Sequence, residues 1–251
     1  MFARLALFAA LCLGLIVAKA PASLLDTGLA AVSANAVRLG GSEGTLWRGQ
    51  GMLVVGDAAS GNARPWLPLA WHFKPGGLLG GEMSWASAPE SGLRGELSLG
   101  LNGFRLRDFA VEAPAAMVIP LLPGVLVQSG WGGDMAVRAA DWRCSPNASC
   151  EGDFLVQWRG ASSALLPGQR FGDYEVQGRG NGSAIHFDIH TLAGEIVIAG
   201  AGSWSASSLP SFQGRISSPP EVLKQLPNIA GGAVVADAQP GHFVVRFPVQ
   251  H

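Results

Sequence analysis

The sequence predicts a mainly β protein with one N-terminal membrane-spanning helix. Two observations lead to this fold class. The first residues form a single apolar run bordered by basic residues. From Val37 onward, apolar residues instead recur at every second position, in short runs separated by glycines. Such alternation is typical of antiparallel strands that turn one face toward a core and the other toward water. We therefore expect a curved antiparallel sheet with a few short helices.

Residues 1–22 are expected to form the membrane anchor. A membrane-spanning helix needs roughly 17–25 residues, and this segment is long enough if Arg4 and Lys19 reach the head groups at its two ends. A cleaved signal peptide is the alternative, because the apolar run ends in an Ala-Lys-Ala sequence that suits a signal peptidase. Pro21 follows that sequence directly and disfavours cleavage. We expect an uncleaved anchor with its short N-terminus in the cytoplasm, and under either interpretation the remainder is exported.

The exported part is expected to contain a short linking helix at residues 23–36 and a β-rich domain at residues 37–251. Apolar residues at helical spacing in Ser23–Ala34 predict the helix. Two further stretches, Ala113–Leu122 and Pro220–Leu226, are expected to be helical or irregular, and prolines keep the first one short. No Gly/Ser linker or block of charge divides the β-rich domain.

The alternating runs define the apolar side of the expected sheet. The residues assigned to it are Leu69, Trp71, Phe73, Met83, Trp85, Leu97, Leu99, Leu101, Met135, Val137, Phe154, Val156, Trp158, Tyr174, Val176, Ile185, Phe187, Ile189, Ile196, Ile198, Phe243, Val245, Phe247 and Val249. Tryptophans among these runs predict a sheet core. A concave apolar face that holds acyl chains is the alternative interpretation.

The charge balance argues against a nucleic-acid partner. The formal net charge is −1 and only 14 % of the residues are charged. Nucleic-acid binding depends on a clear excess of lysine and arginine on one face, and the composition offers no such excess.

The best candidate for catalysis or metal binding is the sequence IHFDIH. His186, Asp188 and His190 project from one face of the expected strand, where two histidines at positions i and i+2 can share a metal ion. They are also the polar partners that any half-buried strand needs, and no further ligand lies nearby in the sequence. We interpret them as a solvated face and assign His72 and His242 the same role.

Other sequence motifs give no support for an enzyme. The segment GRGNG joins two strand-like runs, so we interpret it as a hairpin turn and not as a phosphate loop, which a helix would follow. No nucleophile elbow or metalloprotease motif occurs. We therefore predict no enzyme activity, no catalytic residue, no cofactor and no bound metal.

The cysteines fit an exported protein. Cys144 and Cys150 lie in WRCSPNASCEG, where a proline and an asparagine can turn the chain between them. This spacing suits a disulfide between two short strand ends in an oxidising compartment. A metal-binding pair is the alternative, but it lacks a second cysteine or histidine cluster. Cys12 lies in the apolar segment and is expected to be inert.

The stretch EGTLWRGQG places Trp47 two residues before Gly49 and four before Gly51. In a strand these three residues share a face, and a large ring can lie over bare glycine backbone. We expect this stretch to begin the first strand of the sheet, with Trp47 covering both glycines. The six residues expected to form a structural motif without catalytic function are Gly44, Thr45, Leu46, Trp47, Arg48 and Gly49.

The order of these segments resembles the N subunit of the bacterial type II secretion system. An apolar anchor is followed by PASLLD, EGTLWRGQG and the tryptophan-bearing strand LAWHF. GELSLGLNGFRLRDF, the helix-like APAAMVIPLLPG and DWRCSPNASCEGDFLVQWRG come next, before a β-rich tail. The resemblance covers Leu24 to Val249, and its most specific parts are GTLWRG and the cysteine pair before LVQWRG.

The resemblance implies a single-span protein of the bacterial inner membrane with most of its chain in the periplasm. It implies a non-catalytic, accessory role in the machinery that exports folded proteins across the outer membrane. The partners it implies are other inner-membrane subunits of that machinery. The alternative is a similarity to AsmA-like envelope proteins, whose groove-shaped sheets are associated with lipid movement, and lipid would then be a further partner.

Overall fold

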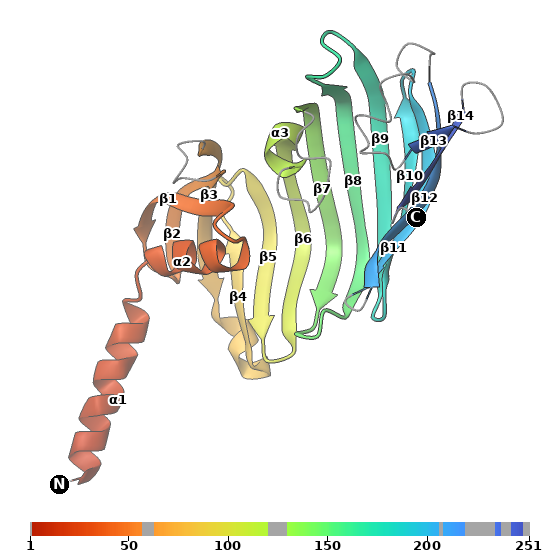
Figure 1. Ribbon diagram of the computed structural model, residues 1–251. Helices are drawn as coiled ribbons and strands as arrows, with labels where there is room; N and C mark the ends of the chain where they lie inside the picture. Colours follow the sequence, from red (N-terminus) through yellow and green to blue (C-terminus); the bar gives the residue numbers. More distant parts are fainter. Residues whose placement is uncertain are drawn as a thin grey trace. The chain divides into compact units, whose positions relative to one another are not determined.

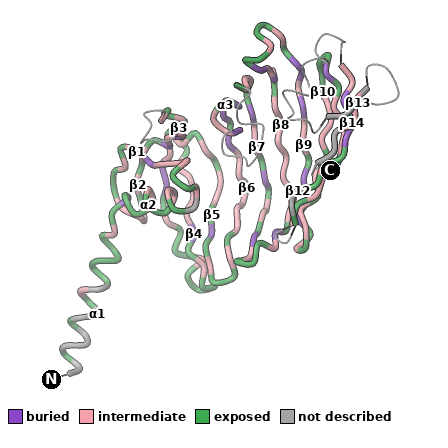
Figure 2. The backbone as a smooth tube through the Cα atoms, in the orientation of Figure 1, coloured by how far each residue is buried: buried purple, intermediate pink, exposed green. Residues whose placement is uncertain are grey.

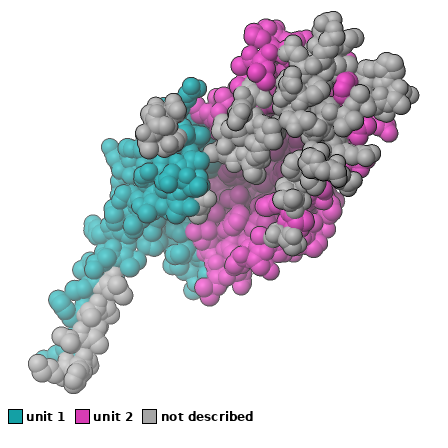
Figure 3. Space-filling model, viewed as in Figure 1, with its two compact units in different colours: residues 1–94 teal, residues 95–251 magenta. Residues whose placement is uncertain are grey.

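The computed structural model describes residues 2–56, 63–119, 130–205, 208–218, 234–236 and 242–247. The chain forms two compact units, Met1–Arg94 and Gly95–His251 (Figure 3). The predicted mainly β class, with antiparallel, curved sheet and a few short helices, is confirmed (Figure 1).

The first unit combines two helices with antiparallel strands that pair in sequence order (Figure 1). Its elements are α1 (Phe2–Ala18), α2 (Ser23–Val32), β1 (Val37–Gly44), β2 (Arg48–Val55), β3 (Arg64–Lys74), the 3₁₀-helix η2 (Pro75–Gly80) and β4 (Glu82–Ser87). Within it, β1 pairs with β2, β2 with β3 and β3 with β4.

α1 lies within residues 1–22, the segment that the sequence assigns to a membrane anchor. In the part of the chain that the structure describes, no helix combines the length and the apolar character that crossing a membrane requires. The prediction of a membrane-spanning helix is therefore not confirmed. α2 falls within the expected linking segment, residues 23–36, and packs beside β1.

The core of the first unit lies on one face of its sheet. Leu39 pairs with Leu53, which pairs with Leu67, and directly paired residues of antiparallel strands share a face. All three side chains are buried. Trp71 lies two positions beyond Leu69 on the same face and is also buried, so this indole extends the aliphatic core.

The second unit is built almost entirely of long antiparallel strands. Its elements are β5 (Leu93–Gly100, which starts two residues before the unit), β6 (Gly103–Pro114), α3 (Ala115–Val118), β7 (Trp131–Cys144), β8 (Cys150–Ser163), β9 (Arg170–Asn181), β10 (Ile185–Ala193), β11 (Val197–Ser205), β12 (Ser208–Ser217), β13 (Val234–Ala236) and β14 (His242–Phe247). The strands follow sequence order up to β12, and β14 then lies between β12 and β13.

Among the described residues, two clusters of buried side chains lie in the core of the second unit. Figure 2 marks along the backbone which residues are buried. The first cluster packs Ala115 and Ile119, from α3 and the residue after it, against Met135 of β7. The second contains Phe171, Tyr174, Ile196 and Ile216. Trp131 and Trp158 pack against both clusters and so join them into one apolar layer. The Tyr174 hydroxyl donates a 3.0 Å hydrogen bond to the Ile196 carbonyl, so burial leaves no unmet polar group there.

Farther along the same face of β7 to β12, aromatic rings lie over glycine backbone. A Cβ on Gly178 would lie 2.1 Å from Phe154 Cζ, and one on Gly202 would lie 2.2 Å from Phe187 Cζ. Side chains at these glycines would displace the rings, so glycine is required there to keep them flat on the sheet. The face is made of Trp142, Phe154, Gly178, Gly180, Phe187, Gly200, Gly202, Trp204, Phe212 and Gly214, and we call it the aromatic–glycine face.

The prediction of which face of the strand is covered is wrong for β5. Leu97 and Leu99 are exposed and Leu101 is 96 % exposed, whereas Ser98 is buried. Met83 in β4 is likewise exposed next to a buried Ser84. Alternation identifies the two faces of a strand, but the elements that pack against the strand decide which face is covered.

The two expected helical interruptions have different outcomes. In Ala113–Leu122, β6 continues through Pro114 and the helix α3 is only four residues long. Pro220–Leu226 lies outside the described residues, as does Val249 of the last expected strand. The segment GRGNG mostly continues β9 to Asn181, and the turn that follows begins at Gly182, so the expected hairpin lies a few residues later than predicted.

Candidate functional site

The candidate site is the junction where the end of α1 meets the turn between β1 and β2, and we call it the α1 junction. The Trp47 indole nitrogen donates a 2.8 Å hydrogen bond to the Val17 carbonyl of α1. The Leu46 amide donates to the Ala20 carbonyl at 2.8 Å, and Pro21 forms a β-bridge with Thr45. The end of α1 and the residues after it are therefore hydrogen-bonded into the sheet.

Glycine and threonine give the turn its shape. Gly44 has a positive φ of 91°, and a Cβ there would lie 2.5 Å from the Arg48 carbonyl oxygen. Only glycine fits such a position without strain. The Thr45 hydroxyl accepts hydrogen bonds from the backbone amides of Trp47 at 3.3 Å and Arg48 at 3.2 Å. The turn is thus held by local hydrogen bonds that its own sequence provides.

Aromatic side chains from β3 and β4 hold the turn from the sheet side. The Leu46 carbonyl accepts hydrogen bonds from the indoles of Trp71 at 3.1 Å and Trp85 at 2.9 Å. The Phe73 ring lies edge-on between Trp47, at 4.8 Å between ring centroids, and Trp85, at 5.5 Å. These geometries are favourable for aromatic pairs, so the four rings fix the turn and, through it, the end of α1.

The expectation that Trp47 begins a strand and covers Gly49 and Gly51 is wrong. Trp47 lies in the turn before β2, and β1 precedes it in the sheet. The ring over Gly49 belongs to Trp71, whose Cζ2 would be 2.6 Å from an added Cβ, and Leu39 occupies the space beside Gly51. Two-residue spacing places side chains on one face only inside a strand, and the turn interrupts that spacing. A signal was available, because Gly-Thr is typical of a turn and LAWHF supplies a second tryptophan.

A cleft of about 750 Å³ lies beside the junction in the first unit. Arg48, the one charged residue of the motif, lines it together with His72, which it faces directly across β2 and β3. Glu43 and Glu90 add acidic groups to the lining. The cleft therefore offers charges of both signs and is suited to polar contacts with another protein more than to an apolar ligand.

The residues expected to be a solvated strand face in IHFDIH lie in β10. His190 Nε2 is 3.4 Å from Glu175 Oε1, and Glu175 also accepts hydrogen bonds from Gln157 and Gln177, both at 2.8 Å. The two glutamine hydrogen bonds lower the pKa of Glu175, with a smaller contribution from His190. His186 and Asp188 line a second cleft of about 670 Å³ with charged neighbours. Among the described residues, no group of three or more His, Cys, Asp and Glu side chains is placed to hold a metal ion.

Cys144 and Cys150 form a disulfide, and Cys12 is a free cysteine. The two bonded cysteines are the last residue of β7 and the first of β8, and they pair directly across the two strands. Gly103 packs against this end of the hairpin, where an added Cβ would clash with the Cys144 carbonyl. The bond therefore closes the β7–β8 hairpin at a tightly packed point in the second unit.

Comparison with known proteins identifies the family. A family model described as Type II secretion system (T2SS), protein N, matches residues 35–235, which include the motif Gly44–Gly49 and both bonded cysteines but neither α1 nor α2. No curated protein and no solved structure matches the chain significantly. The family match spans most of the chain and agrees with the order of segments that the sequence shows. The chain therefore belongs to the family of type II secretion system protein N.

Proposed function

We propose that the protein is an accessory, non-catalytic component of the type II secretion machinery at the bacterial inner membrane. The family membership carries this proposal. The site described above agrees with it, because the α1 junction is a structural connection made of backbone hydrogen bonds and aromatic rings.

Attachment to the membrane is proposed to depend on α1. Phe8 is 67 % exposed and Ile16 69 %, and Leu11, Leu15 and Val17 are exposed as well. These exposed large apolar residues, counted only among the side chains of α1 that the structure describes, favour an apolar environment around the helix. The α1 junction would then hold the first unit at a fixed distance from the membrane surface.

The secretion role is tested by deleting the gene in the bacterium that encodes it. We expect type II substrates to accumulate in the periplasm and the parent gene to restore their release. Affinity purification of the tagged full-length protein from solubilised membranes should also recover other inner-membrane subunits of the machinery. Normal secretion in the deletion strain, together with the absence of those subunits from the purified material, would refute the proposal.

The cleft beside the α1 junction is the surface that we propose for one of these contacts. Arg48→Glu reverses the charge that Arg48, the first residue of β2, gives to the cleft, while leaving the aromatic rings in place. We expect this variant to keep the parent's melting temperature and to recover less of the partner subunits. Arg64→Glu is the matched control, because Arg64 is an exposed residue of β3 that does not line the cleft. Equal recovery with both variants would exclude the cleft.

A second candidate function is the binding of lipid acyl chains by the aromatic–glycine face. Trp142, Phe154, Phe187 and Phe212 are only half-buried, and Trp204 is 45 % exposed. Flat rings over glycine make a smooth apolar surface, and such a surface is suited to acyl chains. Native mass spectrometry of the full-length protein should then detect bound phospholipid that Trp204→Glu loses. The absence of phospholipid from the parent protein would remove this candidate.

A further inference from the structure

Strand β1 lies at the outer edge of the first unit's strands, where it pairs with β2 on one side. The backbone groups of Val37 and Leu39 point to its other side, since their amides bond to side chains and not to β2. An edge strand with open amides and carbonyls can pair with a strand of another chain, and natural proteins usually cover such edges.

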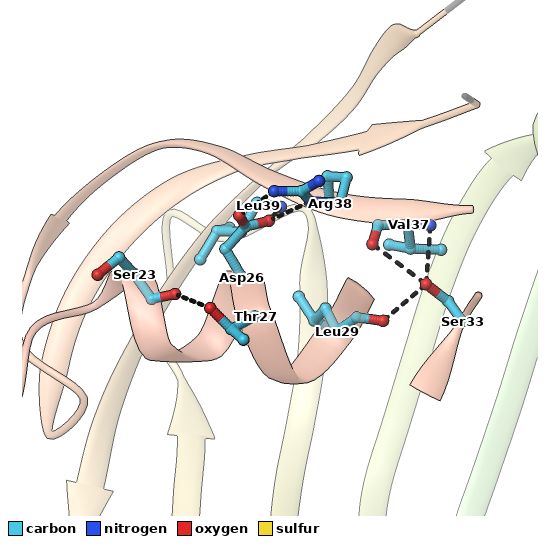
Figure 4. Close-up of polar contacts among 8 residues, drawn as sticks. All are labelled: Ser23, Asp26, Thr27, Leu29, Ser33, Val37, Arg38 and Leu39. Atoms are coloured by element: carbon cyan, nitrogen blue, oxygen red, sulfur yellow. Dashed lines mark hydrogen bonds and ion pairs between the residues drawn. The ribbon is translucent and has the colours of Figure 1, made fainter. Parts of the chain in front are cut away.

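Asp26 of α2 and Ser33, the C-cap residue after the helix, cover this edge with their side chains (Figure 4). The Ser33 hydroxyl oxygen accepts a 3.0 Å hydrogen bond from the Val37 amide. The Ser33 hydroxyl oxygen is also within donating distance of the carbonyl oxygens of Leu29, at 2.6 Å, and Val37, at 3.2 Å. Ser33 therefore contacts both backbone groups that Val37 turns outward.

Asp26 covers the next outward position. Its Oδ1 accepts the Leu39 amide at 2.8 Å and Arg38 Nε at 2.8 Å, and its Oδ2 accepts Arg38 Nη2 at 2.5 Å. The bidentate pair fixes the carboxylate against the strand. Thr27, the residue after Asp26, instead donates to the Ser23 carbonyl within α2, and it is exposed (Figure 4).

The polar side chains in and next to α2 therefore have different partners, because some bond to β1 and Thr27 bonds within the helix. α2 has no side-chain cap at its N-terminus, and the side chains of Asp26 and of the C-cap residue Ser33 bond to the edge of β1. Asp26 and Ser33 occupy the positions that a neighbouring strand's backbone would otherwise take.

We propose that α2 is an intramolecular guard of the β1 edge, and that its displacement lets β1 pair antiparallel with β1 of a second copy of this chain. A second copy is the partner that the geometry favours, because two identical edge strands related by a twofold axis present the same groups to each other. Val37 turns both its amide and its carbonyl outward and Leu39 turns its amide outward, so each copy offers donors and an acceptor to the other.

The test uses the full-length protein in detergent, with its molar mass measured by light scattering over a range of concentrations. The parent protein is expected to be monomeric. Asp26→Ala with Ser33→Ala removes both covering side chains, and alanine at position 26 is a good helix former within α2. We expect this double variant to dimerise with a dissociation constant at least about tenfold lower than the parent's. The reason is that the two side chains no longer compete with a second strand for the outward backbone groups of β1. Thr27→Ala is the matched control and should behave as the parent.

A third substitution locates the contact. Val37 is the first residue of β1, where proline is tolerated, and Val37→Pro removes one outward amide from the edge. Added to the double variant, it should restore the monomer if the dimer forms through β1. A double variant that stays monomeric at all concentrations, or a dimer that persists with Val37→Pro, would overturn the proposal. If the double variant does not fold, Ser33→Ala alone is measured under the same criteria.

Discussion

At the scale of single residues, the molecule depends on large rings placed against bare backbone. Trp71 needs Gly49, Phe154 needs Gly178 and Phe187 needs Gly202. Trp47 has a different role, because its ring packs edge-on against Phe73 and its indole nitrogen donates a hydrogen bond to α1. Glycines in a strand weaken it by themselves, and here the rings that lie over them compensate for that weakness.

Trp47→Ala is expected to destabilise the first unit. The ring is half-buried, so the loss in the free energy of unfolding should lie near or below about 3 kcal/mol, the lower end for truncating a buried aromatic residue. Chemical denaturation of the full-length protein gives the value. A change too small to measure would mean that neither the Phe73 contact nor the Val17 hydrogen bond stabilises the fold.

Gly49→Ala should be strongly destabilising, since the new Cβ would lie 2.4 Å from the Glu43 carbonyl oxygen and 2.6 Å from Trp71 Cζ2. Overpacking of this kind typically costs about 1–3 kcal/mol. Gly28→Ala is the control: nothing lies within 4 Å of a Cβ there, and alanine is favoured in a helix by about 1 kcal/mol over glycine. The two variants should therefore shift the denaturation midpoint in opposite directions, and shifts in the same direction would contradict the packing described for Gly49.

At the scale of elements, side-chain bonds between neighbouring strands connect the strands of the second unit. The disulfide between Cys144 and Cys150 joins adjacent ends of β7 and β8, and an ion pair joins β6 to β7. Asp141 of β7 accepts hydrogen bonds from Arg105 of β6, at 2.6 Å and 2.5 Å, and from Arg143 at 3.1 Å. These contacts fix how neighbouring strands align more than they determine whether the unit folds.

Removing the disulfide is expected to cost little. The cross-link closes a short loop, and the entropic contribution grows only logarithmically with loop length, so a loop of about seven residues contributes roughly 2 kcal/mol. The double variant Cys144→Ser, Cys150→Ser should therefore fold and unfold at a modestly lower temperature. Thiol labelling under denaturing, non-reducing conditions should modify only Cys12 in the parent protein. Labelling of all three cysteines would exclude the bond in the isolated protein.

Low pH should weaken the ion pair between Arg105 of β6 and Asp141 of β7. Hydrogen bonds from Arg105 lower the pKa of Asp141 to about 2, against the opposing effect of burial and with a further contribution from Arg143. A carboxyl whose pKa is lowered by folding stabilises the protein above its ordinary pKa near 4, and this contribution disappears as the pH falls toward 2. Asp141→Asn should thus lose less stability than the parent between pH 5 and pH 3, measured by denaturation at each pH. Because the side chain is 36 % exposed, solvent screens the pair and the difference should be small.

At the scale of the whole molecule, the N-terminal segment is joined to the first unit as part of its structure. Ala22 is buried, and the Ala20 carbonyl and the Val17 carbonyl accept hydrogen bonds from the turn between β1 and β2. A chain cut after Ala20 would lose Val17, and with it the acceptor of the Trp47 indole. Retention of residues 1–20 stays a prediction, which rests on the unfavourable proline at position 21.

We therefore expect the protein isolated from bacterial membranes to retain residues 1–20. Mass spectrometry of its N-terminus after membrane fractionation provides the measurement. A variant that lacks residues 2–20 should show a lower denaturation midpoint, because the Leu46 amide and the Trp47 indole lose their acceptors. A soluble native product that begins at Pro21 would contradict the proposed attachment through α1.

Some features could be predicted from the sequence because they depend on neighbouring residues. Alternation of apolar residues identified the antiparallel strands of the second unit, including Phe154, Val156 and Trp158 in β8. The spacing of Cys144 and Cys150 around a proline and an asparagine predicted their bond. The order of GTLWRG and the cysteine pair pointed to the secretion family that the family match then showed.

Only the tertiary structure decided which partner each of these side chains meets. The choice of Trp71 over Trp47 as the ring above Gly49 depends on how β3 aligns with β2. The exposure of Leu97 beside a buried Ser98, and the contacts of Asp26 and Ser33 with the edge of β1, depend on the elements that pack nearby. Local periodicity sets the two faces of a strand and the spacing of a turn, because neighbouring backbone geometry determines both. It cannot set the contacts between residues far apart in the sequence, because those depend on register and packing, which form only when the whole unit folds.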